Sequence, residues 1–394
     1  MAKSPPPTSD QLAAELVALH VLAEQRLLAG SASILRRAAP TLEGRLGALT
    51  ALRRLVYRIL AVLEQRSYAL VVAMVDAAQR EGSDDASEIV GKALERIREV
   101  DTTRGTPPPP PGSGVRLPSP DDDPFDLSMA HGDRAAQAIR DDLVSSLQDV
   151  RFRLTRLPDD IYKAIAPHGA MYQVLDNDVT PAQAQAMAWR VFVSQGVRGF
   201  TDRSGREWTL SAYTEMAIRT ASTRAYNTSH LATMRAIGVE YFSVPNTGHP
   251  CPLCFPWQFK ILTDGPLADP AIHVDATIAE AVAAGLFHPN CRHTLLPVFP
   301  GYTVLPDPEQ WTDEHALAYA NTQKQRRYEL AVRKAKRRFE YALDAERRGE
   351  ALADIRRAQR RLREFVRVTG FLRDTRREQV DLSDAYIKLP APIR

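Results

Sequence analysis

Apolar residues recur at steps of three and four along most of this chain, which is the spacing of one face of an amphipathic helix. The pattern begins with Leu12, Leu16, Leu19 and Leu22 and resumes with Leu52, Leu55, Ile59 and Val62. Residues 9–100 are therefore predicted to be strongly helical. We expect a helical N-terminal domain over residues 1–103.

Five consecutive prolines, Pro107 to Pro111, interrupt this pattern, and Gly-Ser-Gly and an Asp-rich run follow them. Polyproline has no backbone donors and little apolar surface to pack, so such a segment is typical of an exposed linker. Residues 104–125 are predicted to be a Pro-rich linker. We expect few contacts across it, so that a protease should separate the two sides.

The region 126–310 combines helical patterns with short extended ones. Helices are predicted over 182–195 and from 211 towards 237, and each is followed by a glycine. Alternating patterns predict short strands over 239–244, 259–262 and 294–298. Strands this short bury little core by themselves, so a metal is expected to tie them together.

The last region, 311–394, resumes the helical spacing in two runs. One extends from Tyr328 to Ala342 and the other from Leu352 to Val366, with Gly349 between them. Such a pattern favours an antiparallel helical hairpin with an apolar seam and an arginine-rich outer face. The predicted fold is mainly α with a small α+β metal-pinned module: a helical N-terminal domain, a Pro-rich linker, a helical core and a C-terminal helical hairpin.

Charge is unevenly distributed, although the formal net charge of the chain is only +3. Residues 324–378 contain 19 Lys and Arg against 9 Asp and Glu, or +10, which leaves −7 for the remainder. Basic clusters of this kind neutralise phosphates, although a solvated helix face is an equally good interpretation. The candidate residues for non-specific binding of double-stranded DNA are Arg333, Lys334, Lys336, Arg337, Arg338, Arg356, Arg357, Arg360 and Arg361.

All three cysteines lie between residues 251 and 291, in a CxxC and an HxxC motif. Two such turns supply the four soft ligands of a structural zinc site, and an odd number of cysteines cannot pair completely as disulfides. The predicted zinc ligands are Cys251, Cys254, His288 and Cys291, with His293 or His249 as alternatives for the imidazole.

The same segment contains half of a zinc deaminase signature, because Pro250 precedes the CxxC motif. Those enzymes also need an HxE motif, in which the glutamate transfers protons, and the chain contains none. Gly-rich phosphate loops, GxSxG and HExxH are absent as well. The sequence therefore predicts no catalytic residues and no enzyme.

The chain has no run of about 18 apolar residues, the length a membrane span requires, and its first residues have no apolar segment of a signal peptide. We therefore expect no membrane association. Synthesis in a reducing cytoplasm would favour thiolate ligands over disulfides.

Four features in one order support a family resemblance: a helix with Tyr213-Thr-Glu-Met-Ala-Ile-Arg-Thr220, the Cys251–Cys254 knuckle, His288-Pro-Asn-Cys-Arg292 and a long basic helical tail. Over roughly 200–380 the chain resembles the phage minor capsid proteins, namely the phage minor capsid protein 2 and Mu protein F-like head morphogenesis group. Members often continue as HPNCRC, whereas His293 stands here in place of the last cysteine. This difference bears on the ligand set.

The resemblance implies a low-copy structural protein of the virion that lies inside the capsid near the portal. It implies contacts with the portal protein, with major capsid or scaffold protein and with packaged DNA, roles in head assembly and genome ejection, and a stay in the host cytoplasm during assembly. The alternatives are a toxin-like transferase fused to a head module and a zinc-containing nucleic-acid-binding protein. Few basic residues lie between the two metal knuckles, which argues against the second.

Overall fold

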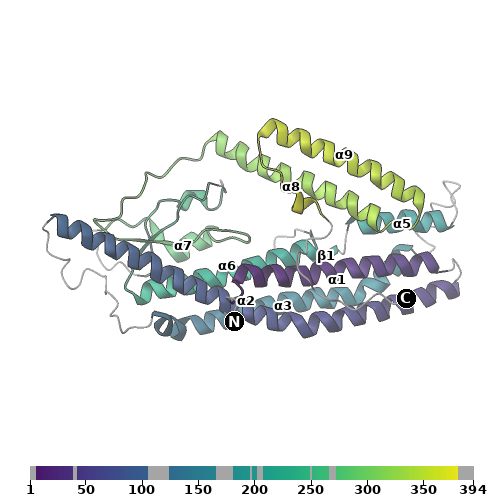
Figure 1. The fold of residues 1–394 in the computed structure, drawn as a ribbon, viewed down its shortest axis with the longest axis horizontal. Coiled ribbons are helices and arrows are strands. Elements are labelled where there is room, and N and C mark those ends of the chain that lie inside the picture. The colour runs from purple at the N-terminus through teal and green to yellow at the C-terminus, as the bar shows by residue number, and fades with distance from the viewer. Residues whose placement is uncertain are drawn as a thin grey trace, which may run out of the picture. The chain divides into compact units, whose positions relative to one another are not determined.

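The computed structural model describes residues 6–38, 42–104, 124–165, 181–195, 198–201, 207–248, 251–265 and 272–379. Most of these residues are helical, as predicted (Figure 1). Contacts divide the chain into two compact units, each built from three separate segments. Unit 1 comprises Met1–Ala13, Val71–Leu143 and Met216–Ala320, and unit 2 comprises Ala14–Leu70, Val144–Glu215 and Asn321–Arg394.

The predicted N-terminal helicity is confirmed by α1 (Ser9–Arg37) and α2 (Leu42–Arg104). After them come α3 (Pro124–Ile165), α5 (Pro181–Gln195) and α6 (Leu210–Ala236), and the last two agree closely with the helices predicted there. The prolines of the predicted linker fall in 105–123, outside the described residues.

The core of unit 2 is a helical cluster. Leucines of α1 and α2, such as Leu27 and Leu63, pack with Leu154 of α3 and Trp189 of α5. Trp189 also donates its indole N–H to the carbonyl oxygen of Tyr341 at 2.8 Å, so the only polar atom of this buried side chain is satisfied. A two-stranded antiparallel ribbon, β1 (Arg198–Thr201) and β2 (Glu207–Thr209), also belongs to this unit.

The predicted hairpin consists of α8 (Asp313–Glu340) and α9 (Ala345–Thr369), which run side by side in Figure 1. The helices are separated at residues 341–344 and not at Gly349, which lies inside α9. Asp344 explains this position, because its carboxylate caps α9 by accepting a hydrogen bond from the Arg347 N–H at 2.7 Å. Gly370, with φ of 70°, ends the helix.

The predicted seam of the hairpin is present in part. Val332, Ala335 and Leu362 are buried, but Leu352 is 38% exposed and its neighbour Ala351 is buried instead. The buried face of α9 therefore includes Ala351 and Leu362. Alanine is a weak signal of burial in a sequence, so the pattern alone favoured Leu352.

Unit 1 contains a four-stranded mixed sheet in the order β5-β4-β3-β6. Its strands are β3 (Tyr241–Ser243), β4 (Leu262–Thr263), β5 (Ala276–Thr277) and β6 (Leu296–Val298). The central strand β3 pairs antiparallel with β4 and β6, and β5 pairs parallel with β4. The strand predicted over 259–262 is present only from its last residue onward, because Phe259 adopts a positive φ of 61° that breaks an extended chain.

The core of unit 1 joins this sheet to two helices. Phe242 of β3 packs with Met234 of α6 and with Val90 of α2, and Cys254 and Cys291 belong to the same cluster. The clusters of both units thus contain residues from before and after the predicted linker. The division into 1–103, 104–125, 126–310 and 311–394 remains a prediction from the sequence.

Candidate metal centre and basic hairpin

Two short turns present the cysteines, and each has proline in its second position. In the first turn, the N–H of Cys254 donates to the carbonyl oxygen of Cys251 at 3.2 Å. In the second, the N–H of Cys291 donates to the carbonyl oxygen of His288 at 2.9 Å, and Asn290 has φ of 65°. Proline followed by asparagine with positive φ is the pattern of a type II turn, so the HPNC sequence determines its own local fold.

The short helix α7 (Ile278–Ala283) precedes the second turn and positions it. Its first residues form a capping box, in which the side chains of Thr277 and Glu280 each accept a hydrogen bond from the other's backbone N–H. The helix is followed by Gly285, with φ of 111°, where an added Cβ would lie 3.2 Å from a side-chain carbon of Leu253. The glycine therefore lets the two cysteine-bearing segments approach each other.

The side chains of the two turns converge. The Sγ atoms of Cys254 and Cys291 are 3.6 Å apart, and the Cys251 Sγ is 3.1 Å from the His288 Nε2. All three cysteines are free thiols. In a tetrahedral zinc site the corresponding edges are about 3.8 Å between sulfurs and about 3.6 Å between sulfur and nitrogen, from the usual bond lengths. The sulfur–sulfur separation is close to that of a zinc site and the sulfur–nitrogen separation is shorter, so each pair has donors of the kind that zinc takes.

Electrostatics in the cluster favours the thiolate form of Cys251 and Cys291, which is the form that binds a metal. Hydrogen bonding to Cys254 lowers the pKa of Cys251 to about 3 and that of Cys291 to about 4, whereas the pKa of Cys254 is raised. The Cys251 side chain also raises the pKa of His288 to about 9. A cation in this cluster would take the place of the shared protons and bind all three sulfurs as thiolates.

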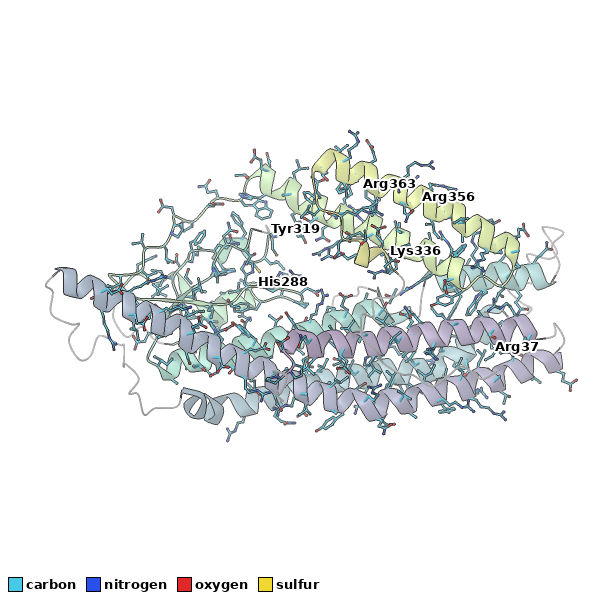
Figure 2. The ribbon with its side chains drawn as sticks, in the orientation of Figure 1. Arg37, His288, Tyr319, Lys336, Arg356 and Arg363 are labelled. Carbon is cyan, nitrogen blue, oxygen red and sulfur yellow. The ribbon has the colours of Figure 1, made fainter. Side chains whose placement is uncertain are left out.

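Two histidines compete for the fourth position. His288, labelled in Figure 2, directs Nε2 towards Cys251, and its Nδ1 lies 2.8 Å from the carbonyl oxygen of Pro289. Such a carbonyl contact fixes the tautomer that leaves Nε2 free for a metal. His293 is buried, with its Nδ1 3.3 Å from the Cys291 Sγ. Each histidine belongs to a three-residue donor group that includes Cys254.

The other predicted alternative, His249, lies outside the described residues. Among the described residues, the structure therefore brings together two overlapping donor groups, Cys251–Cys254–His288 and Cys254–Cys291–His293, which share Cys254.

Sequence reasoning missed two residues of α6 that hold this site. Asn227 donates from Nδ2 to the carbonyl oxygen of His293 at 3.0 Å, and His230 places Nε2 3.0 Å from the carbonyl oxygen of Leu295. The other nitrogen of His230 lies 3.0 Å from the carbonyl oxygen of Gly82 in α2. The sequence carried no distinct signal for this pair, because α6 also buries other polar residues such as Ser229 and Thr233.

The basic hairpin divides the predicted DNA-contacting residues into two groups. On α9, Arg356, Arg357, Arg360 and Arg361 are exposed, and Figure 2 shows the labelled Arg356 projecting from that helix. On α8, the predicted residues are half-buried or buried.

The α8 residues make internal contacts. Arg333 donates to the carbonyl oxygen of Arg377 at 2.7 Å, and Lys336 donates to the side chain of Gln379. Arg338 pairs with Asp354 at 2.8 Å. Lys334 is half-buried and has a partner of its own.

Arg337 is buried and its guanidinium pairs with the equally buried Glu24 at 3.4 Å and with the Ser211 hydroxyl at 3.1 Å. An arginine held in this way does not reach an external phosphate, so we leave Arg337 out of the DNA-contacting surface.

Comparison with known proteins gives a family match over residues 131–367, which is more than half of the chain, to the model described as "Phage minor capsid protein 2". The chain belongs to this family. The matched range includes both the metal centre and the greater part of the basic hairpin.

A curated relative of this minor capsid protein is a "Structural protein" of Lactococcus phage LL-H. It is 29% identical over 184 residues, an alignment that covers 43% of the present chain and 48% of the relative. The minor capsid protein thus spans about half the length of that relative. Both matches describe structural phage proteins. No solved structure matches. Among the described residues, none of the helices has the length and apolarity that crossing a bilayer requires.

Proposed function

We propose that this minor capsid protein is a low-copy component inside the phage head that associates with the portal and lies against packaged DNA. The family match carries the proposal, because one matched range contains both the metal centre and a hairpin with an exposed row of arginines. Contacts with major capsid or scaffold protein during assembly, and departure with the genome at ejection, belong to the same proposal.

The metal centre has a structural role in this proposal. Four protein ligands fill a tetrahedral zinc and leave no position for a substrate. Zinc would connect the turn at Cys251 to the turn at His288 and so close the small sheet of unit 1. The proposed ligands are Cys251, Cys254, Cys291 and His288.

The DNA contact is assigned to α9. The four predicted arginines of α9 are exposed, whereas the predicted cations of α8 are committed to internal contacts. Binding through phosphates would be independent of sequence and would weaken with salt as counterions are released.

The decisive experiment is a mass-spectrometric inventory of purified virions and procapsids, combined with a pull-down on purified portal protein. We expect the chain in both particles at low copy and retained by the portal. Its absence from virions and procapsids alike would overturn the proposal. If the chain were retained by major capsid protein and not by portal protein, the proposed association with the portal would be wrong.

A further inference from the structure

A shallow groove of ≈ 630 Å³ lies between α8 and α9, within unit 2. Its cations are Lys324 from α8 and Arg357, Arg360 and Arg361 from α9. One carboxylate, Glu364, also lines the groove, but it is held by Arg367 through two hydrogen bonds of 2.6 and 3.1 Å. The cations therefore outnumber the acid at this surface, and the groove suits an anionic ligand.

The remaining lining is aromatic and apolar. Tyr328 and Phe365 pack with their ring centroids 5.4 Å apart, and the Lys324 ammonium lies 5.6 Å from the Phe365 centroid. Phe371 supports Phe365 from the side with an edge contact at 6.3 Å. Val368, which is 68% exposed, completes the lining. Phe365 is buried, so the half-buried Tyr328 is the aromatic side chain that the groove offers to a ligand. An aromatic side chain beside arginines is not needed for a contact with phosphates alone.

From this combination we infer that the groove binds a single-stranded nucleic acid, with phosphates on the arginines and a base against Tyr328. The inference rests on the proposed DNA contact of the hairpin and assigns it a substrate class. A duplex keeps its bases stacked inside and offers only its backbone to such a surface, whereas a single strand offers an unstacked base and phosphates together.

The side-chain chemistry agrees with a phosphodiester. Three of the four cations are arginines, whose planar fork binds phosphate oxygens in pairs. Arg357 and Arg361 are one helical turn apart and so lie on the same face of α9. Arg357 is also 3.6 Å from Asp354, yet its side chain is 60% exposed and can turn towards a ligand.

The test measures binding of a labelled oligothymidylate and of a duplex of equal length to the full chain, at several salt concentrations. We expect the single strand to bind at least tenfold more tightly at equal salt. The groove variant R357E/R361E should lose most of this binding. The matched variant R356E/R363E, which carries the same change of charge on exposed residues outside the groove, should lose much less.

Tyr328→Leu tests the base contact, because it keeps apolar volume and removes the ring. It should weaken oligothymidylate binding about fivefold or more, the value of one base stack, and leave binding of inorganic polyphosphate unchanged.

Three other results would overturn the inference in distinguishable ways. If both charge variants lost the same affinity and the duplex bound as tightly as the single strand, the proposed DNA contact of α9 would stand, but the groove would not be a binding site for single strands. Tighter, groove-dependent binding of a polyglutamate peptide would assign the groove to an acidic protein segment. If neither nucleic acid bound, the DNA contact itself would fail.

Discussion

The sulfur atoms of Cys254 and Cys291, 37 residues apart in sequence, lie 3.6 Å from each other without a disulfide between them. Buried thiols at this separation repel one another as thiolates unless a proton or a cation lies between them. This pair is the link between the two turns.

We predict that the folded chain contains about one zinc ion and that Cys254→Ser abolishes its binding. The variant should lose about 4 kcal/mol or more of unfolding free energy, as expected when a structural metal is lost. Metal analysis and thermal unfolding measure both effects. Val282→Ser, a change at an exposed position of α7, is the control and should leave both unchanged. A native protein without stoichiometric zinc would contradict the prediction.

The fourth ligand is predicted to be His288. Its Nδ1 contact with Pro289 directs Nε2 to the cluster, so His288→Gln should change the visible spectrum of the cobalt-substituted protein and increase metal loss to a chelator. His293→Gln should leave the cobalt spectrum unchanged. The reverse result would assign the position to His293.

His230 is predicted to retain the metal without touching it. It contacts the backbone at Leu295 and at Gly82, so His230→Ala leaves both carbonyl oxygens without this partner and frees the segment that follows Cys291. We expect metal loss to a chelator to be about tenfold faster, with partial recovery in His230→Gln, which keeps one donor. Tyr226→Phe is the control, because it keeps the ring that stacks on His230 at 5.4 Å and removes only the hydroxyl, which donates to Asp85 at 2.6 Å. Unchanged metal release in His230→Ala would show that α6 does not support the site.

His20 predicts a pH dependence of stability in unit 2. Burial lowers its pKa from 6.5 to about 4, and Arg151 contributes to the lowering. The unfolded chain therefore binds a proton at higher pH than the native chain does, so stability falls as the pH falls from 6.5 towards 4. The loss is about 3 kcal/mol for a shift of this size. Denaturant unfolding should show that His20→Leu lacks this part of the acid destabilisation; an equal pH slope in both proteins would exclude His20 as the cause.

Cleavage within 105–123 provides a test of domain organisation. Because Val90 of α2 shares a hydrophobic cluster with Met234 and Phe242, we expect the two fragments to remain associated after an inserted protease site is cut. Size-exclusion chromatography under native conditions measures this. Separation of the fragments, with 126–394 folded and loaded with zinc, would instead support the linear division predicted from the sequence.

The sequence by itself determined the local features of this protein. Periods of three and four predicted the helices, and prolines at the second position of each turn fixed the two knuckles, because these depend on interactions between residues that are close in the chain. The spacing of cysteines and of His288 indicated a metal, and the charge of 324–378 indicated a polyanion. The order of these motifs also identified the family.

Only the tertiary structure decided which of these side chains are available. Nothing local shows that Arg337 is buried against Glu24 or that His230 bridges α2 and the segment after Cys291, because each contact joins residues more than 60 positions apart. The aromatic groove likewise exists only where α8 and α9 pack together. Which side chains are buried, and which distant residues come into contact, depends on the tertiary packing of the elements. The periodicity of a sequence contains little information about that packing.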